Sequence, residues 1–157
     1  MRAPSSGKIK LALAALALLL TFARARQNIA RNRPATASST RFGHPSAVVN
    51  GVVEWGSYAL HTQADRPAWF MVDLQGTHRI DEVRVYGRGD ALLNEDAPPV
   101  PVEVSLDAHT WKQVGACEGV FTQASPCQVH AGGAPARYVR LTYPYLVLSE
   151  VEVFESR

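Results

Sequence analysis

The sequence has few cysteines and little excess charge, and both shortages restrict the class of protein. Only two cysteines occur among 157 residues, and the formal net charge is +2. A disulfide-rich scaffold is therefore excluded, and too few Cys and His residues lie together for a zinc site. All the acidic residues follow residue 33, whereas seven of the sixteen Lys and Arg residues precede residue 34. The rest of the chain is mildly acidic, which argues against a basic nucleic-acid-binding face.

The sequence also lacks the residue patterns of catalytic sites. It has no Ser–His or Cys–His pattern, no glycine-rich loop of the kind that binds phosphate, and no set of metal ligands with a catalytic spacing. Glu95 and Asp96 are neighbours on a proline-flanked stretch, where adjacent acids usually stay solvated. We therefore expect a protein that is not an enzyme.

The only long apolar run lies at the N-terminus. Residues 11–23 are an apolar run of 13 residues, preceded by a cationic opening and followed by a small-residue site that ends at Ala25. This three-part pattern predicts that residues 1–25 are a secretory signal peptide, cleaved after Ala25. A retained N-terminal membrane anchor is the alternative, although a spanning helix needs roughly 20 apolar residues. Both readings predict a secreted or membrane-anchored protein that faces outside the cytoplasm.

The two cysteines, Cys117 and Cys127, lie in the part of the chain that we expect to be exported. A pair of cysteines in an oxidising compartment most simply forms one disulfide bond, and we predict that bond here. Two free thiols are the alternative. The sequence thus predicts one covalent cross-link, between residues 117 and 127.

Helical periodicity is almost absent from residues 26–157. Short segments alternate polar and apolar residues and are separated by Gly, Pro, Asn and Asp, which is typical of an antiparallel β-sandwich or barrel. We expect one domain over residues 26–157, with turns at 73–78 and 131–135 among others. The predicted strands are residues 69–74, 80–86, 102–106, 111–114, 128–130, 137–142 and 150–154.

Several of these segments match one family pattern, in the right order. With them the chain resembles the discoidin domain, also called the coagulation-factor C-type domain, over about residues 27–154. The resemblance implies an all-β fold, an eight-stranded antiparallel β-sandwich or jelly-roll barrel, and an extracellular binding module. The matching segments are residues 28–39, 68–74 (AWFMVDL), 80–86 (IDEVRVY), 102–111, 137–141 (RYVRL) and 148–154 (LSEVEVF).

One branch of this superfamily is matched by three polar residues. His61 is separated from Arg88 by 26 residues, and Asp90 completes an Arg-x-Asp pattern. This spacing is similar to the sugar-binding signature of the F-type lectins, or fucolectins, and implies that all three residues bind carbohydrate. The lectin pattern continues with a basic residue five positions after the aspartate, where this chain has an acid, Glu95, or Asp96 if one residue has been inserted. The difference argues against fucose itself and leaves other glycans open.

Aromatic residues near His61 are further candidates for sugar contact. Tyr58 and Trp55 lie in the same predicted loop, and an aromatic ring offers a flat apolar surface to the face of a sugar. Each candidate also has a structural alternative. Backbone groups can satisfy a loop histidine, and Arg88 can form a surface ion pair with the acids that follow it.

The resemblance further implies a calcium site, because many relatives bind a structural Ca²⁺ through loop carbonyls, an aspartate before a glycine and a C-terminal glutamate. The matching residues are Asn50, which precedes Gly51, together with Ser149 and Glu150. Asparagine in place of aspartate weakens such a site, because Ca²⁺ prefers several oxygen ligands with net negative charge. Calcium is the one cofactor that the sequence suggests, with Glu150 as its main side-chain ligand.

Together these features predict an exported, non-enzymatic, lectin-like module that binds a glycan or glycoconjugate at the loop end of a β-sandwich. The alternative is an adhesion domain that binds phospholipid head groups or an extracellular protein through apolar loop tips. Leu92 and Leu93 are the candidate tip residues. A structural cell-envelope module without a free ligand is a third class that the sequence leaves open.

Overall fold

The structure, a computed structural model, describes residues 26–53, 55–64, 67–88 and 98–156. No helix in these ranges is long and apolar enough to cross a membrane. Several sequence predictions fall on parts of the chain outside the described residues. These are the signal peptide at 1–25, Asp90, Leu92, Leu93, Glu95 and Asp96.

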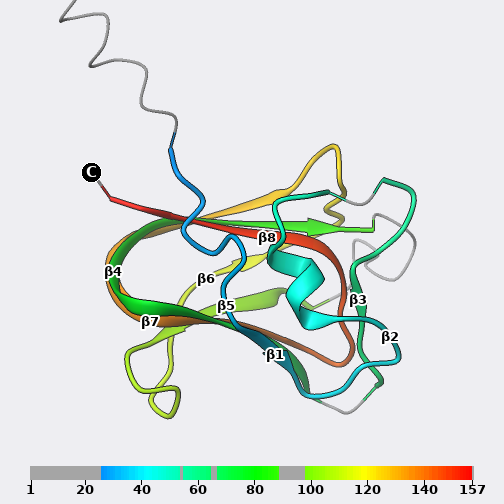
Figure 1. The fold of residues 1–157 in the computed structure, drawn as a ribbon, viewed down its shortest axis with the longest axis horizontal. Coiled ribbons are helices and arrows are strands. Elements are labelled where there is room, and N and C mark those ends of the chain that lie inside the picture. The colour runs from blue at the N-terminus through cyan, green and yellow to red at the C-terminus, as the bar shows by residue number, and fades with distance from the viewer. Residues whose placement is uncertain (1–25, 54, 65–66, 89–97, 157) are drawn as a thin grey trace, which may run out of the picture.

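Eight antiparallel strands and one short 3₁₀ helix make up the described chain (Figure 1), which confirms the predicted all-β fold. Neighbouring strands follow the order β2-β3-β8-β4-β7-β5-β6, and β1 pairs with β4. In chain order the elements are β1 (Ala35–Ala37), β2 (Phe42–Gly43), η1 (Pro45–Val49), β3 (Leu60–His61), β4 (Ala68–Gly87), β5 (Val100–Ser105), β6 (Lys112–Cys117), β7 (Cys127–Tyr143) and β8 (Val147–Glu155).

Strands β4 and β7 are longer than the sequence predicts. The turns expected at 73–78 and 131–135 are wrong, because both segments lie within strands, where the pairing of β4 with β7 shifts in register. Gln75, Gly132 and Gly133 have φ angles of 62°, 61° and 76°. Such residues bend a strand without ending it. Figure 1 shows β4 and β7 curving together at one end of the molecule, so that each strand contributes to both layers.

The core lies between these layers and consists mainly of branched aliphatic side chains. Every second residue of β4 and β5 is buried over long stretches, as the predicted alternation requires. The strands β1, β2 and β3 were not predicted, because two or three residues are too few to display an alternating pattern. The predicted strand 102–106 ends one residue early. Leu106 is 54% exposed, because the Asp107 carboxylate accepts backbone hydrogen bonds that turn the chain.

An ion pair fixes the start of the bend in β4. Both carboxylate oxygens of Asp73 accept hydrogen bonds from Arg137, each 2.8 Å long, and one oxygen also accepts the backbone N–H of Gln75. The hydrogen bonds from Arg137 are the main cause that holds the pKa of Asp73 below its usual value. A depressed pKa means that the folded chain gains stability from this pair only while the carboxyl is ionised.

We expect Asp73→Asn to lower the free energy of unfolding at pH 7 by about 1–2 kcal/mol, because a charged acceptor is lost and the pair is partly solvated. The wild-type protein loses the same stabilisation as pH falls through the lowered pKa of Asp73, below 3.8. The difference between the two proteins should therefore shrink in acid. Urea unfolding at pH 7 and at about pH 3 measures it, with the exposed-site variant Glu118→Gln as control. A difference that is constant with pH would contradict this account.

Candidate functional site

His61 lies at the loop end of the sandwich, on the two-residue strand β3. Its backbone pairs with Phe42 of β2 on one side and with Val147 of β8 on the other. Three aromatic rings surround its partly buried imidazole, at centroid distances of 6.0 Å for Phe42, 5.7 Å for Tyr58 and 6.2 Å for Tyr145. We call these four side chains the His61 cluster. The cluster is an aromatic surface with the imidazole of His61 at its centre.

Arg88 directly follows β4 and reaches this cluster. Its guanidinium carbon lies 5.4 Å from the centroid of the Tyr58 ring, within the range of a cation–π contact. The structure thus brings together His61, Arg88 and Tyr58, all of which the sequence singles out. Trp55 is not part of this group. It is 71% exposed and has no ring contact with the cluster within the described part of the chain.

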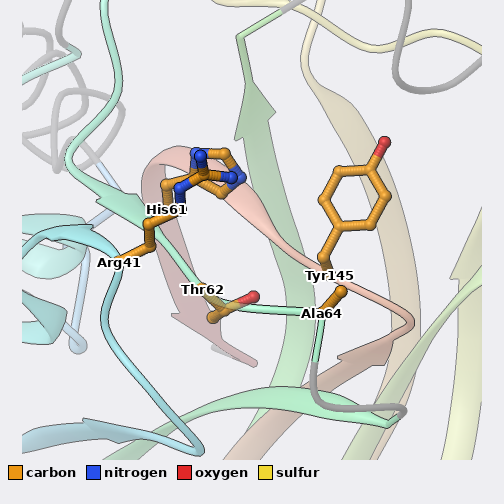
Figure 2. A pocket seen from close by; sticks show the side chains of 5 residues that line it. All are labelled: Arg41, His61, Thr62, Ala64 and Tyr145. Carbon is orange, nitrogen blue, oxygen red and sulfur yellow. The ribbon is translucent and has the colours of Figure 1, made fainter.

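A pocket of about 270 Å³ opens beside His61 (Figure 2). Arg41, Thr62, Ala64 and Tyr145 line it together with the histidine. Figure 2 shows Arg41 and His61 on one wall and the Tyr145 ring across from them. The sequence analysis missed Arg41 and Tyr145, because neither belongs to the lectin spacing. Only the pairing of β2, β3 and β8 brings them to His61.

Backbone hydrogen bonds hold the walls of this pocket in place. The N–H of Arg41 donates to the carbonyl of His61 at 2.7 Å, and the N–H of Thr62 donates to the carbonyl of Leu146 at 2.9 Å. In return, the N–H of Leu146 donates to the Thr62 hydroxyl at 2.8 Å. Thr62 is 1% exposed, so its hydroxyl ties the chain next to Tyr145 to β3. The pocket walls are therefore preformed.

A disulfide bond closes a loop on the other side of the His61 cluster. Cys117, the last residue of β6, is bonded to Cys127, the first residue of β7, which confirms the predicted cross-link. The bond joins residues 10 positions apart. In the chain-entropy model, closing so short a loop stabilises the fold by roughly 2–3 kcal/mol.

This disulfide-closed loop supports two of the site residues. Phe121 is buried against Gly87, where an added Cβ would lie 2.7 Å from the Phe121 carbonyl oxygen. Gln123 Nε2 donates a hydrogen bond of 3.1 Å to the carbonyl of Ser57. The residues that follow Gly87 and Ser57 are Arg88 and Tyr58. The loop therefore holds in place the backbone that carries Arg88 and the Tyr58 ring beneath its guanidinium.

A buried carboxylate lies beside the turn at Asn50. Glu150 is fully buried, and its Oε1 accepts the backbone N–H of Gly51 at 3.0 Å. Its Oε2 has no hydrogen-bond partner among the described residues. Burial raises the pKa of Glu150 to about 8, although the bond from Gly51 acts in the opposite direction.

Calcium fits this carboxylate in part. A buried carboxylate oxygen without a partner is what a bound cation would satisfy, and Ser149 lies fully buried beside it. Against this, the Asn50 side-chain oxygen already accepts a backbone N–H, and the side chain of Arg31 packs against Gly51. Within the described ranges, no three His, Cys, Asp or Glu residues are grouped to hold a metal ion. The calcium site remains a prediction.

The fold and the loop-end cluster define a β-sandwich binding module. Its identity follows from comparison with known families. The chain belongs to the F5/8 type C domain family, whose model matches residues 34–145. This confirms the predicted discoidin resemblance. No curated protein matches the chain.

Solved structures with this fold include sugar-binding modules. The lectin domain of lectinolysin, in complex with Lewis B antigen, is 30% identical, with a TM-score of 0.68, over 83% of this chain and 98% of that chain. A fucose-binding module of Streptococcus pneumoniae is 27% identical, with a TM-score of 0.69, over 85% and 98%. A fucolectin from striped bass (Morone saxatilis) serum is 23% identical, with a TM-score of 0.70, over 83% and 48%. The first two neighbours are sugar-binding modules, in agreement with the predicted lectin-like branch, and the fucolectin shares the fold.

We expect loss of the disulfide to loosen the site more than the rest of the fold. In a Cys117→Ala/Cys127→Ala variant, hydrogen–deuterium exchange should accelerate at residues 57–61 and 87–88, because the closed loop no longer holds Phe121 and Gln123 in place. Exchange at residues 137–143, the last seven residues of β7, should change little. Equal acceleration in both regions would mean that the loop has no specific role at the site.

Proposed function

We propose that this chain is an exported, lectin-like module that binds a glycan at the loop end of its β-sandwich. The observation that carries the proposal is the line of contacts from Arg88 over Tyr58 to His61, with distances of 5.4 Å and 5.7 Å. His61 and Arg88, with 26 residues between them in the sequence, thus both contact the ring of Tyr58. The spacing that resembles the lectin signature has a spatial counterpart in this chain.

The chemistry of these groups suits a sugar. Histidine and arginine supply N–H donors for the ring oxygen and hydroxyl groups of a saccharide, and arginine presents its donors as a fixed fork. The Tyr58 ring offers an apolar surface to the C–H face of the same sugar. Asp90, two residues after Arg88, is proposed to orient the guanidinium. None of these roles requires bond-breaking chemistry, so we assign no catalytic residue.

The relatives support the choice of ligand class. The structure of the lectinolysin domain contains Lewis B antigen, and the pneumococcal relative is a fucose-binding module. The match to this chain covers 98% of the length of each of these two structures. We therefore propose a glycan as the partner and leave its identity to experiment, because Glu95 stands where the fucose-binding pattern has a basic residue.

We expect the purified protein to bind a subset of glycans on an array, and His61→Ala to weaken that binding by about tenfold or more, since a partly buried donor to the sugar is removed. Arg88→Lys should also weaken binding, because lysine keeps the charge and loses the fork. His109→Ala, an exposed histidine beyond β5, is the matched control and should bind normally.

Two results would count against a lectin. Glycan binding that is unchanged in His61→Ala would place the site elsewhere. Binding to phospholipid vesicles that no glycan on the array competes for would favour the adhesion alternative, which relies on Leu92 and Leu93.

We also propose that Ca²⁺ stabilises the fold through Glu150, with Asn50 and Ser149 beside it. Adding Ca²⁺ after treatment with a chelator should raise the melting temperature of the wild-type protein, because a ligand that binds only the folded state stabilises it. Glu150→Gln should abolish this rise, and Glu118→Gln, at an exposed position, should keep it. A melting temperature that is the same with Ca²⁺ and with chelator would reject the site.

A further inference from the structure

We propose that Arg41 is a specificity-determining residue that binds an anionic substituent, a carboxylate or sulfate, next to the sugar held by His61 and Arg88. This inference rests on the proposed function and names a substrate class for the same site. Its basis is a second guanidinium that lies over a different ring of the His61 cluster from Arg88 and lines a preformed pocket.

The position of Arg41 is fixed although the residue is exposed. It immediately precedes β2, and its backbone N–H is bonded to His61 at 2.7 Å. Its guanidinium carbon lies 5.4 Å from the centroid of the Phe42 ring. That ring belongs to the His61 cluster, so Arg41 stacks on one edge of the aromatic surface as Arg88 stacks on another. The two guanidinium groups approach His61 over different rings.

These contacts divide the site into two halves that share His61. One half consists of Arg88 and Tyr58. The other half is the pocket of about 270 Å³ between Arg41, His61 and Tyr145 (Figure 2). His61 contacts Tyr58 and Tyr145 at similar centroid distances, 5.7 Å and 6.2 Å. The two halves therefore adjoin at His61, and a sugar held in the first would lie next to the second.

The second half favours an anion. The guanidinium of Arg41 forms no ion pair and no side-chain hydrogen bond with any residue in the described part of the chain. Thr62 offers it no accessible acceptor, because the threonine is 1% exposed and its hydroxyl accepts the N–H of Leu146. A carboxylate or sulfate accepts two parallel hydrogen bonds from a guanidinium and adds the attraction of opposite charges, which a neutral hydroxyl lacks. An acidic substituent would gain both.

Arg41 also supplies a second basic group at a site where the lectin pattern expects one and this chain lacks it. The lectin pattern expects a second basic residue after Asp90, and this chain has Glu95 at that position. Arg41 brings a second guanidinium to the His61 cluster from another part of the chain, over the ring of Phe42. A guanidinium at this position would bind a different substituent of the sugar. Specificity would then change while His61 and Arg88 still bind the sugar.

The test uses matched pairs of probes: a neutral glycoside that the array identifies, its O-sulfated counterpart, and its uronic-acid counterpart. We expect the wild-type protein to bind one or both anionic members about tenfold more tightly than the neutral one, with a preference that falls as salt is raised. In Arg41→Ala and Arg41→Gln the preference should fall to about one. The sulfated and uronic-acid arms distinguish the two anions.

Arg79→Ala is the matched control, because it removes the same charge from the opposite end of the sandwich. Arg79 lies beside Ser156, whereas His61 pairs with Val147, which places them roughly 30 Å apart along β8. This variant should keep both the affinity and the preference. A wild-type protein without preference, or a preference that survives in Arg41→Ala, would overturn the inference. If no probe binds, or if His61→Ala binds like wild type, the proposed function itself fails.

Discussion

The position of Leu148 in β8, between β3 and β4, is the constraint on which the candidate site depends. Leu148 pairs with Leu60 on one side and with Gly87 on the other. The next residues after Leu60 and Gly87 are His61 and Arg88, so one strand separates them. Two strand spacings amount to roughly 10 Å, a gap that the ring of Tyr58 fills. The long sequence separation of the histidine and the arginine is thereby converted into a short distance.

The two ends of this arrangement are supported very differently. Arg88 follows a strand of 20 residues that pairs with both β7 and β8, and the packing of Phe121 against Gly87 holds the end of that strand. His61 lies on a strand of two residues, β3, between the equally short edge strand β2 and β8. Its position depends on a few backbone bonds, on the buried Thr62 and on packing against aromatic rings. The site therefore joins a half that a long strand holds to a half that hydrogen bonds between short segments hold.

Sequence reasoning recovered what depends on local pattern and missed what depends on tertiary pairing. Alternation in residues 80–86 and 102–106 predicted β4 and β5, because half-buried strands require it. The same reasoning misread residues 73–78 as a turn, since turn residues also serve to bend a continuous strand. The spacing of His61 and Arg88 led to the candidate site through family resemblance. No local signal marked Arg41 or Tyr145, whose relevance arises only when β2, β3 and β8 pair.

These differences in support explain why a new specificity can arise at Arg41 more easily than at Arg88. A change at Gly87 would force a Cβ against Phe121, so the surroundings of Arg88 tolerate little variation. Arg41 is exposed, and its neighbour Phe42 is 49% exposed, so substitutions there disturb no core packing and cost little stability. On the proposed function, Arg88 at the end of the long strand β4 binds the sugar itself. Arg41, next to the short strand β2, selects among the substituents of the sugar. Selectivity then lies where the fold constrains the sequence least.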